Sequence, residues 1–374
     1  MLLLIPGPVT TRPEVRQAMA QDIAPWDNDF RPLYVDARRR VLEIARGDPA
    51  VHAALCLQGC GHFAVEAAIR TFMPVGGRIL VPMAGAYSER MVKLANEAGR
   101  VAVPLKVDPD LPVSAQAVAA ALAADPTISH VGLVYNETGT GVVHDPAPVG
   151  AAIRAAGRRL ILDAVSAFGA LPLDVGAQPE LDAVVFTSNK CLECLPGLSF
   201  TVARIDRLEA CLGQAGSWSF DLADVYANYK RSPGGFRFTP PVQVLAAFVT
   251  ALDLFDAEGG QAARLARYRA NADALYDGAI AIGLVPYLAR EMQGPVVMNI
   301  HAPADPAWSL QGFVDALKRR GFLISNFYNT PQPSFRVGCI GAIGPDDMKN
   351  FVVAVDEALI EMGIRNRMPG QKAA

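Results

Sequence analysis

Short apolar runs alternate with amphipathic stretches through the first half of the chain. The runs are rich in aliphatic and β-branched residues and predict strands, whereas segments between them, such as Ser114–Ala124 and Pro148–Ala156, have the spacing of helices. The predicted strands are Ala53–Gln58, Arg78–Ala84, Val101–Val107, His130–Asn136, Arg159–Ala164, Asp182–Ser188 and Ser199–Ala203. This alternation predicts an α/β fold with a large, doubly wound and mostly parallel sheet.

The pattern changes after residues 231–241, which are rich in glycine and proline. Two long helical stretches follow, and then two strand candidates that are flanked by helices, which together predict a smaller α+β domain. The helices are Val242–Asp256, Gly260–Gly283, Leu310–Arg320 and Asp346–Met362, and the strands are Val296–His301 and Phe335–Cys339. We expect a large domain at residues 16–245 and a small C-terminal domain at 246–374. Residues 1–15 should pack with the active site and the small domain.

Composition and charge exclude several classes of protein. The chain has 34 Lys and Arg against 37 Asp and Glu, a net charge of −3, which indicates neither a nucleic acid nor an anionic membrane as partner. The apolar N-terminal run stops at Pro6-Gly7-Pro8, and no apolar segment is long enough to span a bilayer. We therefore predict a cytoplasmic protein.

The six cysteines are scattered along the chain, which suits a reducing compartment. Cys191 and Cys194 form a C-x-x-C pair. No second pair and no closely spaced histidines accompany it, so a zinc site would lack ligands and a structural role is expected.

Unusual residues follow four of the predicted strands, at the edge of the sheet where α/β proteins bind ligands. Gln58–Phe63 is a glycine-rich turn that opens a helix, which suits a phosphate group but equally suits a tight turn. It is neither a Walker A loop nor a dinucleotide-binding fingerprint. Tyr135–Gly141 is small and polar where another strand ends.

Asp163 and Lys190 close two successive strands. Taken alone, Asp163 could cap the next helix and Lys190 could be a solvated loop residue. Together they match the two groups that pyridoxal phosphate (PLP) requires of its protein, a Schiff-base lysine and a carboxylate facing the pyridine nitrogen. The pair therefore predicts a PLP-dependent enzyme.

Segments along essentially the whole chain, in the same order, resemble the class V aminotransferases of PLP fold type I. They are Ile5–Thr11, Trp26–Asp29, Leu57–Glu66, Gly85–Tyr87, Asp125–His130, Asn136–Gly141, Asp163–Gly169, Asn189–Cys191, Pro196-Gly197, Arg237–Thr239 and Phe335–Gly338. The resemblance implies a homodimer with shared active sites that moves an amine from a small-molecule donor to a 2-oxo acid. It is greatest to enzymes of phosphonate catabolism that transfer the amine of 2-aminoethylphosphonate to pyruvate.

The resemblance also implies a role for each matched residue. Lys190 forms the Schiff base and moves the proton, Asp163 keeps the pyridine nitrogen protonated, and Arg336 binds the acidic group of the substrate with its two-donor fork. Further residues should hold the cofactor: Gly59, Cys60, Gly61 and Thr187 near the phosphate, Tyr87 on the ring, Thr138 or Thr140 near the hydroxyl, Asn189 beside Lys190, and Thr239 from the neighbouring subunit.

Three positions depart from the family pattern. Cys60, His62 and Gly139 stand where small hydroxyl residues are expected, which could weaken PLP binding or change the substrate.

Three other functions remain open: an alanine– or serine–glyoxylate type of class V aminotransferase, a cysteine desulfurase, and a catalytically silent binding protein. Cys339 follows Arg336 within a strand, which disfavours a desulfurase. Retention of Lys190, Asp163 and Arg336 together disfavours a silent relative.

Overall fold

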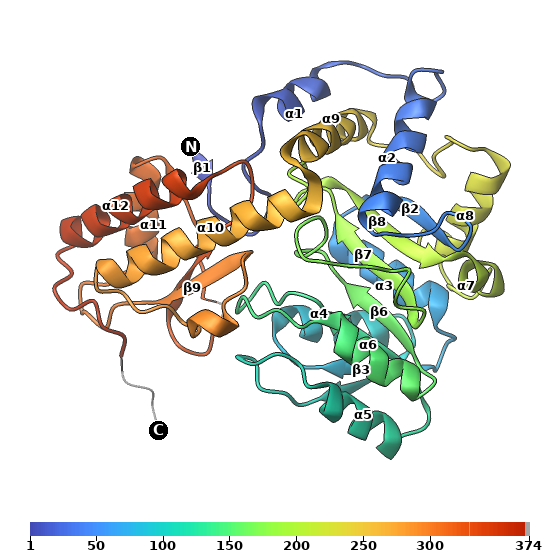
Figure 1. Ribbon diagram of the computed structural model, residues 1–374, viewed down its shortest axis with the longest axis horizontal. Helices are drawn as coiled ribbons and strands as arrows, with labels where there is room; N and C mark the ends of the chain where they lie inside the picture. The colour runs from blue at the N-terminus through green and yellow to red at the C-terminus, as the bar shows by residue number, and fades with distance from the viewer. Residues whose placement is uncertain (329, 371–374) are drawn as a thin grey trace.

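A seven-stranded sheet organises the larger part of the computed structural model, which describes residues 1–328 and 330–370 (Figure 1). Its strand order is β2-β8-β7-β6-β5-β3-β4. The strands are β2 (His52–Gly59), β3 (Arg78–Pro82), β4 (Val101–Leu105), β5 (Ile128–Val134), β6 (Arg159–Asp163), β7 (Leu181–Thr187) and β8 (Gly197–Arg204). All run parallel except β8, which is antiparallel to both of its neighbours. The predicted strands and the doubly wound, mostly parallel sheet are confirmed.

Helices cover both faces of this sheet because both faces are apolar. Successive strand residues enter different cores: Leu160 and Leu162 pack on one side of β6, and Ile161 packs on the other. On the first side lie α2 (Phe30–Ile44), α5 (Ala115–Ala124), α6 (Pro146–Ala155) and α9 (Val242–Glu258). On the second lie α3 (Gly61–Phe72), α4 (Ala86–Glu97), α7 (Ile205–Ala210) and α8 (Leu222–Arg231). We call the sheet and these helices the large domain.

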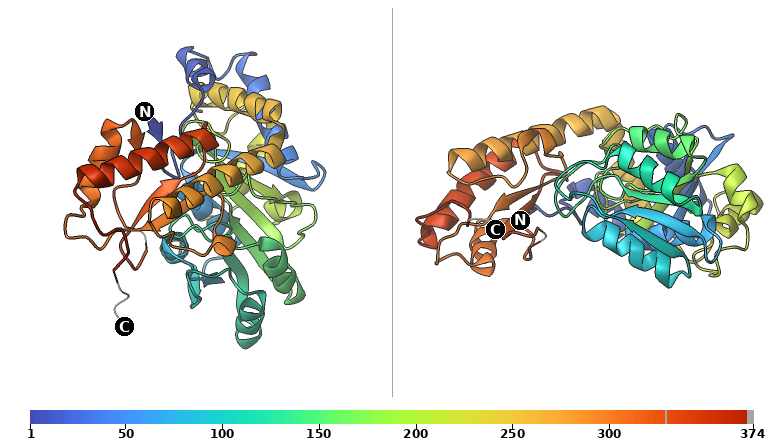
Figure 2. Two further views of the ribbon diagram at one scale, coloured as in Figure 1. Left: turned by 60° about the vertical axis from the view of Figure 1, so that its left-hand side comes forward. Right: turned by 90° about the horizontal axis from the view of Figure 1, so that it is seen from below.

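The small domain is reached through the long helix α10 (Gly260–Ala281), which bridges the two parts in Figures 1 and 2. It contains a two-stranded antiparallel sheet and its own apolar core. Its elements are η2 (Arg290–Met292), β9 (Val297–His301), α11 (Leu310–Arg319), β10 (Phe322–Leu323), β11 (Ser334–Gly338) and α12 (Pro345–Glu361).

The N-terminal segment joins the small domain before it enters the large one. Strand β1 (Leu2–Leu3) pairs in parallel with β10, and Leu4 is buried in the small-domain core. The chain then passes the edge of the large sheet and continues through α1 (Pro13–Gln17) and η1 (Ala18–Ala20) toward α2. In the described residues, no helix combines the length and apolarity that crossing a membrane requires.

Candidate active site

A cavity of about 210 Å³ lies at the edge of the sheet where the parallel strands end. Because β2, β6 and β7 are parallel, the residues that follow them meet at this one edge. Seven of the residues expected to bind a cofactor line the cavity: Cys60, Gly61, Tyr87, Asp163, Thr187, Asn189 and Lys190. The remaining lining residues are Gly7, His62, Val65, Arg90, Met91, Leu94 and Val165.

Lys190 lies in the turn between the antiparallel strands β7 and β8, with its side chain against Gly7. Gly7 has a φ of 146°, which favours glycine, and a Cβ added there would lie 2.5 Å from Cδ and 2.8 Å from Nζ of Lys190, so a larger residue would displace the lysine side chain. Burial lowers the pKa of Lys190 to about 8, and the nearby charge of Arg336 acts in the same direction. Near pH 7 roughly a tenth of the amine is then unprotonated, as a nucleophile or proton carrier requires.

Asp163 ends β6 and faces the same cavity. Burial raises its pKa to about 6, against the opposing effects of a hydrogen bond from the Val165 amide and the charge of Lys190. That amide donates to Oδ1 at 2.9 Å. The carboxylate is therefore mostly ionised at pH 7 although it is buried, and such a group favours a cationic partner. A protonated pyridine nitrogen is a partner of this kind.

The start of α3, which also lines the cavity, is suited to an anion. Helix α3 begins with Cys60 at its N-cap position, and the first N–H groups of a helix have no partner within it. The Thr187 hydroxyl is buried beside them and has no hydrogen-bond partner in the described part of the chain. A phosphate would supply the missing acceptor. The residues present therefore fit PLP, because Asp163, Lys190 and the start of α3 line one cavity.

Arg336 lies near the cavity although it does not line it. It extends from β11 to the loop after β5, where Nη1 donates to the Thr138 carbonyl at 2.7 Å and Nη2 donates to the Ser325 hydroxyl at 3.2 Å. Its Nε is buried and has no partner among the described residues. Burial lowers the pKa of Arg336, while Tyr87 and Glu137 act against that shift. The guanidinium thus keeps a free donor for an acidic group.

Thr138 and Thr140, expected near a cofactor hydroxyl, do not line the cavity. The Thr138 hydroxyl instead donates to that of Ser166 at 2.9 Å. Asn299, on β9, donates to the carbonyls of Gly139 and Thr140 at 2.8 and 3.0 Å. The small-domain sheet thereby holds this loop by its backbone. Asn299 was not singled out from the sequence, because its role depends on a contact between residues some 160 positions apart.

Gly59 and Thr239 also lie outside the cavity. Gly59 has a φ of 143°, and an added Cβ would lie 2.3 Å from the Phe63 ring, so the turn itself requires glycine. Thr239 is exposed and lines a separate cavity of about 500 Å³ together with Trp26 and Phe238. Within one chain it therefore does not reach the site.

Two lining residues that were not predicted have sequence signals in hindsight. Arg90 is one helical turn after Tyr87 on α4, and its guanidinium carbon lies 5.0 Å from that ring. Gly7 belongs to the N-terminal segment that was expected to pack with the active site. The individual contact between Gly7 and Lys190 could not be read from spacing along the chain.

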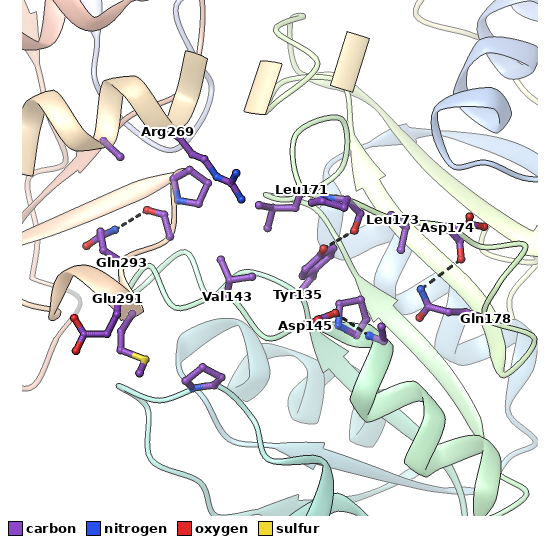
Figure 3. Close-up of a pocket in the computed structure, with 18 of the residues that line it drawn as sticks. Tyr135, Val143, Asp145, Leu171, Leu173, Asp174, Gln178, Arg269, Glu291 and Gln293 are labelled. Carbon is purple, nitrogen blue, oxygen red and sulfur yellow. Dashed lines mark hydrogen bonds between the residues drawn. The ribbon is translucent and has the colours of Figure 1, made fainter. Parts of the chain in front are cut away.

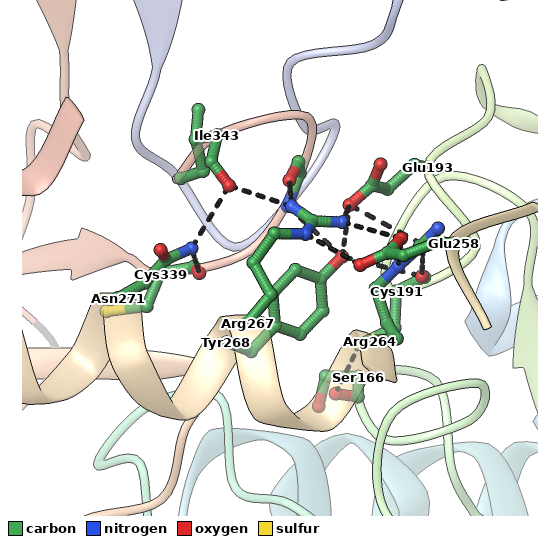
Figure 4. A network of polar contacts seen from close by, with 11 residues as sticks. Ser166, Cys191, Glu193, Glu258, Arg264, Arg267, Tyr268, Asn271, Cys339 and Ile343 are labelled. Atoms are coloured by element: carbon green, nitrogen blue, oxygen red, sulfur yellow. Dashed lines mark hydrogen bonds and ion pairs between the residues drawn. The ribbon is translucent and has the colours of Figure 1, made fainter. Parts of the chain in front are cut away.

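A buried polar network braces the turn that carries Lys190 (Figure 4). Glu193, in the left-handed region with a φ of 54°, accepts hydrogen bonds from Tyr268 at 2.6 Å and from Arg267 at 2.7 Å. Arg264 donates to the carbonyl of Cys191. Because these three partners all lie on α10, the lysine turn is anchored to the helix that joins the domains.

The same network extends into the small domain. Arg267 Nη1 donates to the carbonyls of Gly341 and Ile343 at 2.6 and 2.8 Å, and Asn271 donates to that of Cys339 at 2.9 Å (Figure 4). These carbonyls belong to the segment that follows β11. Arg267 consequently links the two domains with a single guanidinium.

A larger cavity of about 880 Å³ lies where α10 and η2 meet the loops after β5 and β6 (Figure 3). Apolar groups such as Tyr135 and Leu171 line it, with charges of both signs such as Arg269 and Glu291. None of the predicted site residues is among its lining. The chemistry expected from the sequence therefore belongs to the smaller cavity.

Comparison with known proteins agrees with this assignment. Residues 27–305 match the family described as aminotransferase class-V. The chain is 43% identical over 97% of its length to the 2-aminoethylphosphonate–pyruvate transaminase of Paraburkholderia phymatum, and covers 98% of that protein. It is 44% identical over 98% of its length to the enzyme with the same name from Burkholderia thailandensis, and covers 98% of that protein.

Solved structures share the fold. Pyridoxamine–pyruvate aminotransferase from Mesorhizobium loti superposes with a TM-score of 0.89 at 24% identity, covering 98% of this chain and 93% of that one. An aspartate aminotransferase of subgroup IV from Thermus thermophilus gives 0.84 at 26% identity, covering 97% and 100%. The predicted fold class is confirmed over nearly the whole chain.

Proposed function

The chain belongs to the class V aminotransferase family of PLP-dependent enzymes, and from that premise we propose that it transfers the amine of 2-aminoethylphosphonate to pyruvate. The products would be phosphonoacetaldehyde and L-alanine. The observation that carries the proposal is the similarity to transaminases of that name, which extends over 97–98% of the chain. The six free cysteines are in keeping with a cytoplasmic enzyme.

When bound, PLP withdraws electrons from the substrate carbon that bears the amine. Lys190 would hold the cofactor covalently, and its amine, with a pKa lowered to about 8, would take and return the proton at that carbon. Asp163 would hold the protonated pyridine nitrogen. The Thr187 hydroxyl and the first amides of α3 would bind the phosphate.

Arg336 would bind the acidic group of each substrate. A guanidinium presents planar paired donors that match both carboxylate and phosphonate oxygens. Its bonds to Thr138 and Ser325 fix its position beside the cavity. Anchoring the acid there would leave the amine end of a small substrate directed toward Lys190.

A half-reaction titration tests the substrate. The PLP-loaded enzyme is mixed separately with 2-aminoethylphosphonate, L-alanine and L-serine, and the visible absorbance of the bound cofactor is followed. Rapid loss with the phosphonate and with L-alanine, but not with L-serine, is the expected result. Reaction with L-serine in place of the phosphonate would support a serine–glyoxylate type of aminotransferase instead.

Arg336→Lys should raise KM for both acidic substrates by about ten- to a hundredfold, since one charged hydrogen bond is worth roughly 1.5–3 kcal/mol. Lysine keeps the charge but loses the planar fork, so kcat should also fall as the substrate is oriented less well. Steady-state kinetics with each substrate varied separately measures both constants. The matched control is Arg319→Lys, on the exposed face of α11, which should change neither. Unchanged constants in Arg336→Lys would remove that residue from the site.

We also propose that two copies of the chain form a dimer that completes the site. Thr239 is exposed near three large aromatic side chains that also face solvent in the single chain: Trp26, Trp218 and Phe238 are 75%, 69% and 37% exposed. Exposed apolar groups gathered in this way favour association. A second copy is the occupant that would bring Thr239 to a neighbouring phosphate site.

Mixing two inactive variants tests the shared site. Lys190→Ala removes the reactive amine, and Thr239→Asp places a negative charge where Thr239 should meet the partner's phosphate. In a hybrid dimer one of the two sites is then wild-type, so activity should return toward half of the native specific activity per dimer. A different affinity tag on each variant allows the hybrid to be isolated by tandem purification, and size-exclusion chromatography with light scattering verifies that it is dimeric. An inactive hybrid that is demonstrably dimeric would show that each site is built from one chain.

A further inference from the structure

One of the six cysteines differs from the others in its accessibility. Cys60 is exposed, whereas Cys56, Cys191, Cys194, Cys211 and Cys339 are buried. Burial raises the pKa of Cys191, Cys194 and Cys339 to about 12, which keeps those groups as unreactive thiols. A thiol reagent in solution therefore meets a single accessible thiol in this protein.

Cys60 lies where the proposed phosphate site begins. It is the N-cap residue of α3, its side chain makes no capping hydrogen bond, and it lines the 210 Å³ cavity. Its Sγ is 3.3 Å from Nδ1 of His62, another lining residue. Burial and the charge of Arg90 lower the pKa of His62, against the effect of Glu66, so the imidazole is neutral near pH 7 and can accept a proton.

An independent feature indicates that a polar ligand group belongs in the cavity that this thiol lines. The Thr187 hydroxyl, 3% exposed, lines the same cavity and has no hydrogen-bond partner within the described residues. The proposed cofactor would satisfy it through the phosphate. The thiol and the phosphate would then compete for one small space.

We propose that Cys60 is an oxidation site that controls cofactor loading: hydrogen peroxide or a similar small hydroperoxide modifies it while the site is free, and bound phosphate protects it. The inference rests on the proposed function only in taking the phosphate of PLP as the protecting anion. Sulfenic acid at Cys60 would add an oxygen atom where that phosphate has to lie. Ionisation of the acid would add a like charge as well.

The step is balanced with hydrogen peroxide as the oxidant. His62 takes the thiol proton, the sulfur attacks one peroxide oxygen, and the O–O bond breaks. The departing hydroxide takes up that proton and leaves as water, so that a thiol and hydrogen peroxide give a sulfenic acid and water. The other five cysteines are buried in the single chain, so the product should persist until an external thiol reduces it.

Thiol labelling tests whether Cys60 is accessible and protected. The cofactor-free full-length protein should react rapidly with Ellman's reagent at one thiol per chain. Cys60→Ser should lose this reaction and the buried-site control Cys211→Ser should keep it. PLP should slow the labelling by at least about tenfold, whereas pyridoxal, which lacks the phosphate, should protect much less. Rapid labelling in Cys60→Ser, or none in the parent protein, overturns the proposal.

Peroxide treatment tests whether oxidation controls loading. The parent and Cys60→Ser proteins are each treated, cleared of peroxide, and titrated with PLP by visible absorbance, with intact mass recording the added oxygen. The parent should lose at least about tenfold in PLP affinity and regain it with dithiothreitol. Cys60→Ser should bind PLP equally before and after treatment. Unchanged affinity of the oxidised parent refutes this inference alone, whereas failure of the untreated parent to bind PLP refutes the proposed function.

Discussion

Lys190→Ala should reduce transamination by at least about a thousandfold, because it removes both the covalent anchor of the cofactor and the proton carrier. Among the described residues Lys190 is the one lysine that lines the cavity, so none of their amines replaces it. PLP should still bind without a covalent bond, since the Thr187 hydroxyl and the start of α3 remain. Loss of turnover together with retained but weaker cofactor binding is the expected pair of results.

Borohydride reduction and peptide mapping identify the lysine directly. In the parent protein the reduced cofactor should be found on the peptide that contains Lys190. The control is Lys93→Ala, which changes an exposed lysine of α4, the helix that also supplies Tyr87 and Arg90. Lys93→Ala should change neither the turnover rate nor the peptide on which the reduced cofactor is found. A reduced cofactor on any other lysine would disprove the assignment.

Asp163→Asn should leave PLP bound but reduce turnover by several orders of magnitude. An amide is nearly the same size as the carboxylate but cannot stabilise a protonated pyridine nitrogen, so the ring would withdraw electrons poorly. Stopped-flow decay of the cofactor absorbance after mixing with the amine donor measures the effect. Near-native decay would show that another group controls the electronic state of the ring.

Asp163→Asn should increase the stability of the cofactor-free protein, although it reduces turnover. Burial raises the pKa of Asp163 from 3.8 to about 6, so the stability of the cofactor-free protein falls as pH rises through that interval. Above about pH 6 the ionised carboxylate lowers the free energy of unfolding by roughly 3 kcal/mol, because its pKa is raised from 3.8 to about 6. The uncharged amide avoids this cost. Cofactor-free Asp163→Asn should therefore unfold at a higher temperature than its parent at pH 7.5.

Asp182 provides a contrast for that measurement. It is also fully buried, but it is paired with Arg159 at 2.6 Å and Arg207 at 3.0 Å. Asp182→Asn leaves two cations without their partner and should cost roughly 3–5 kcal/mol of stability, with PLP still bound. Thermal unfolding of the two cofactor-free variants at one pH then separates a functional carboxylate from a structural one.

The large sheet could be predicted because its central strands are buried on both faces and are therefore mostly apolar, whereas the edge strand β4 is partly exposed along its length. The reversed direction of β8 could not, since an apolar strand has the same pattern in either direction. The pairing of β1 with β10 was equally hidden, because each is only two residues long and their partners lie about 320 positions apart. Residues 1–15 were nevertheless expected near the small domain.

The catalytic residues could be predicted where each one lies at or just after the end of a strand of the large sheet. Asp163 and Lys190 are conspicuous because charged residues rarely end apolar strands, and parallel strands bring such ends together. The roles of Thr138 and Thr140 were instead expected from the family resemblance, and neither residue lines the cavity. Arg90 has a local signal, its position one helical turn after Tyr87, whereas Asn299 acts across a distance in sequence that no local pattern records. Which residues the second copy contributes also depends on contacts between chains.

Arg267 has a consequence for motion between the domains. It holds Glu193 on the large-domain side, and the carbonyls of Gly341 and Ile343 on the small-domain side. A rotation of the small domain that preserves these bonds must pivot near Arg267. The displacement of each small-domain residue then grows with its distance from Arg267. The parts of the small domain farthest from Arg267 would then move most in such a rotation. The Lys190 turn, bonded next to the pivot, would stay almost stationary, and its amine would keep a constant position while the walls around it move.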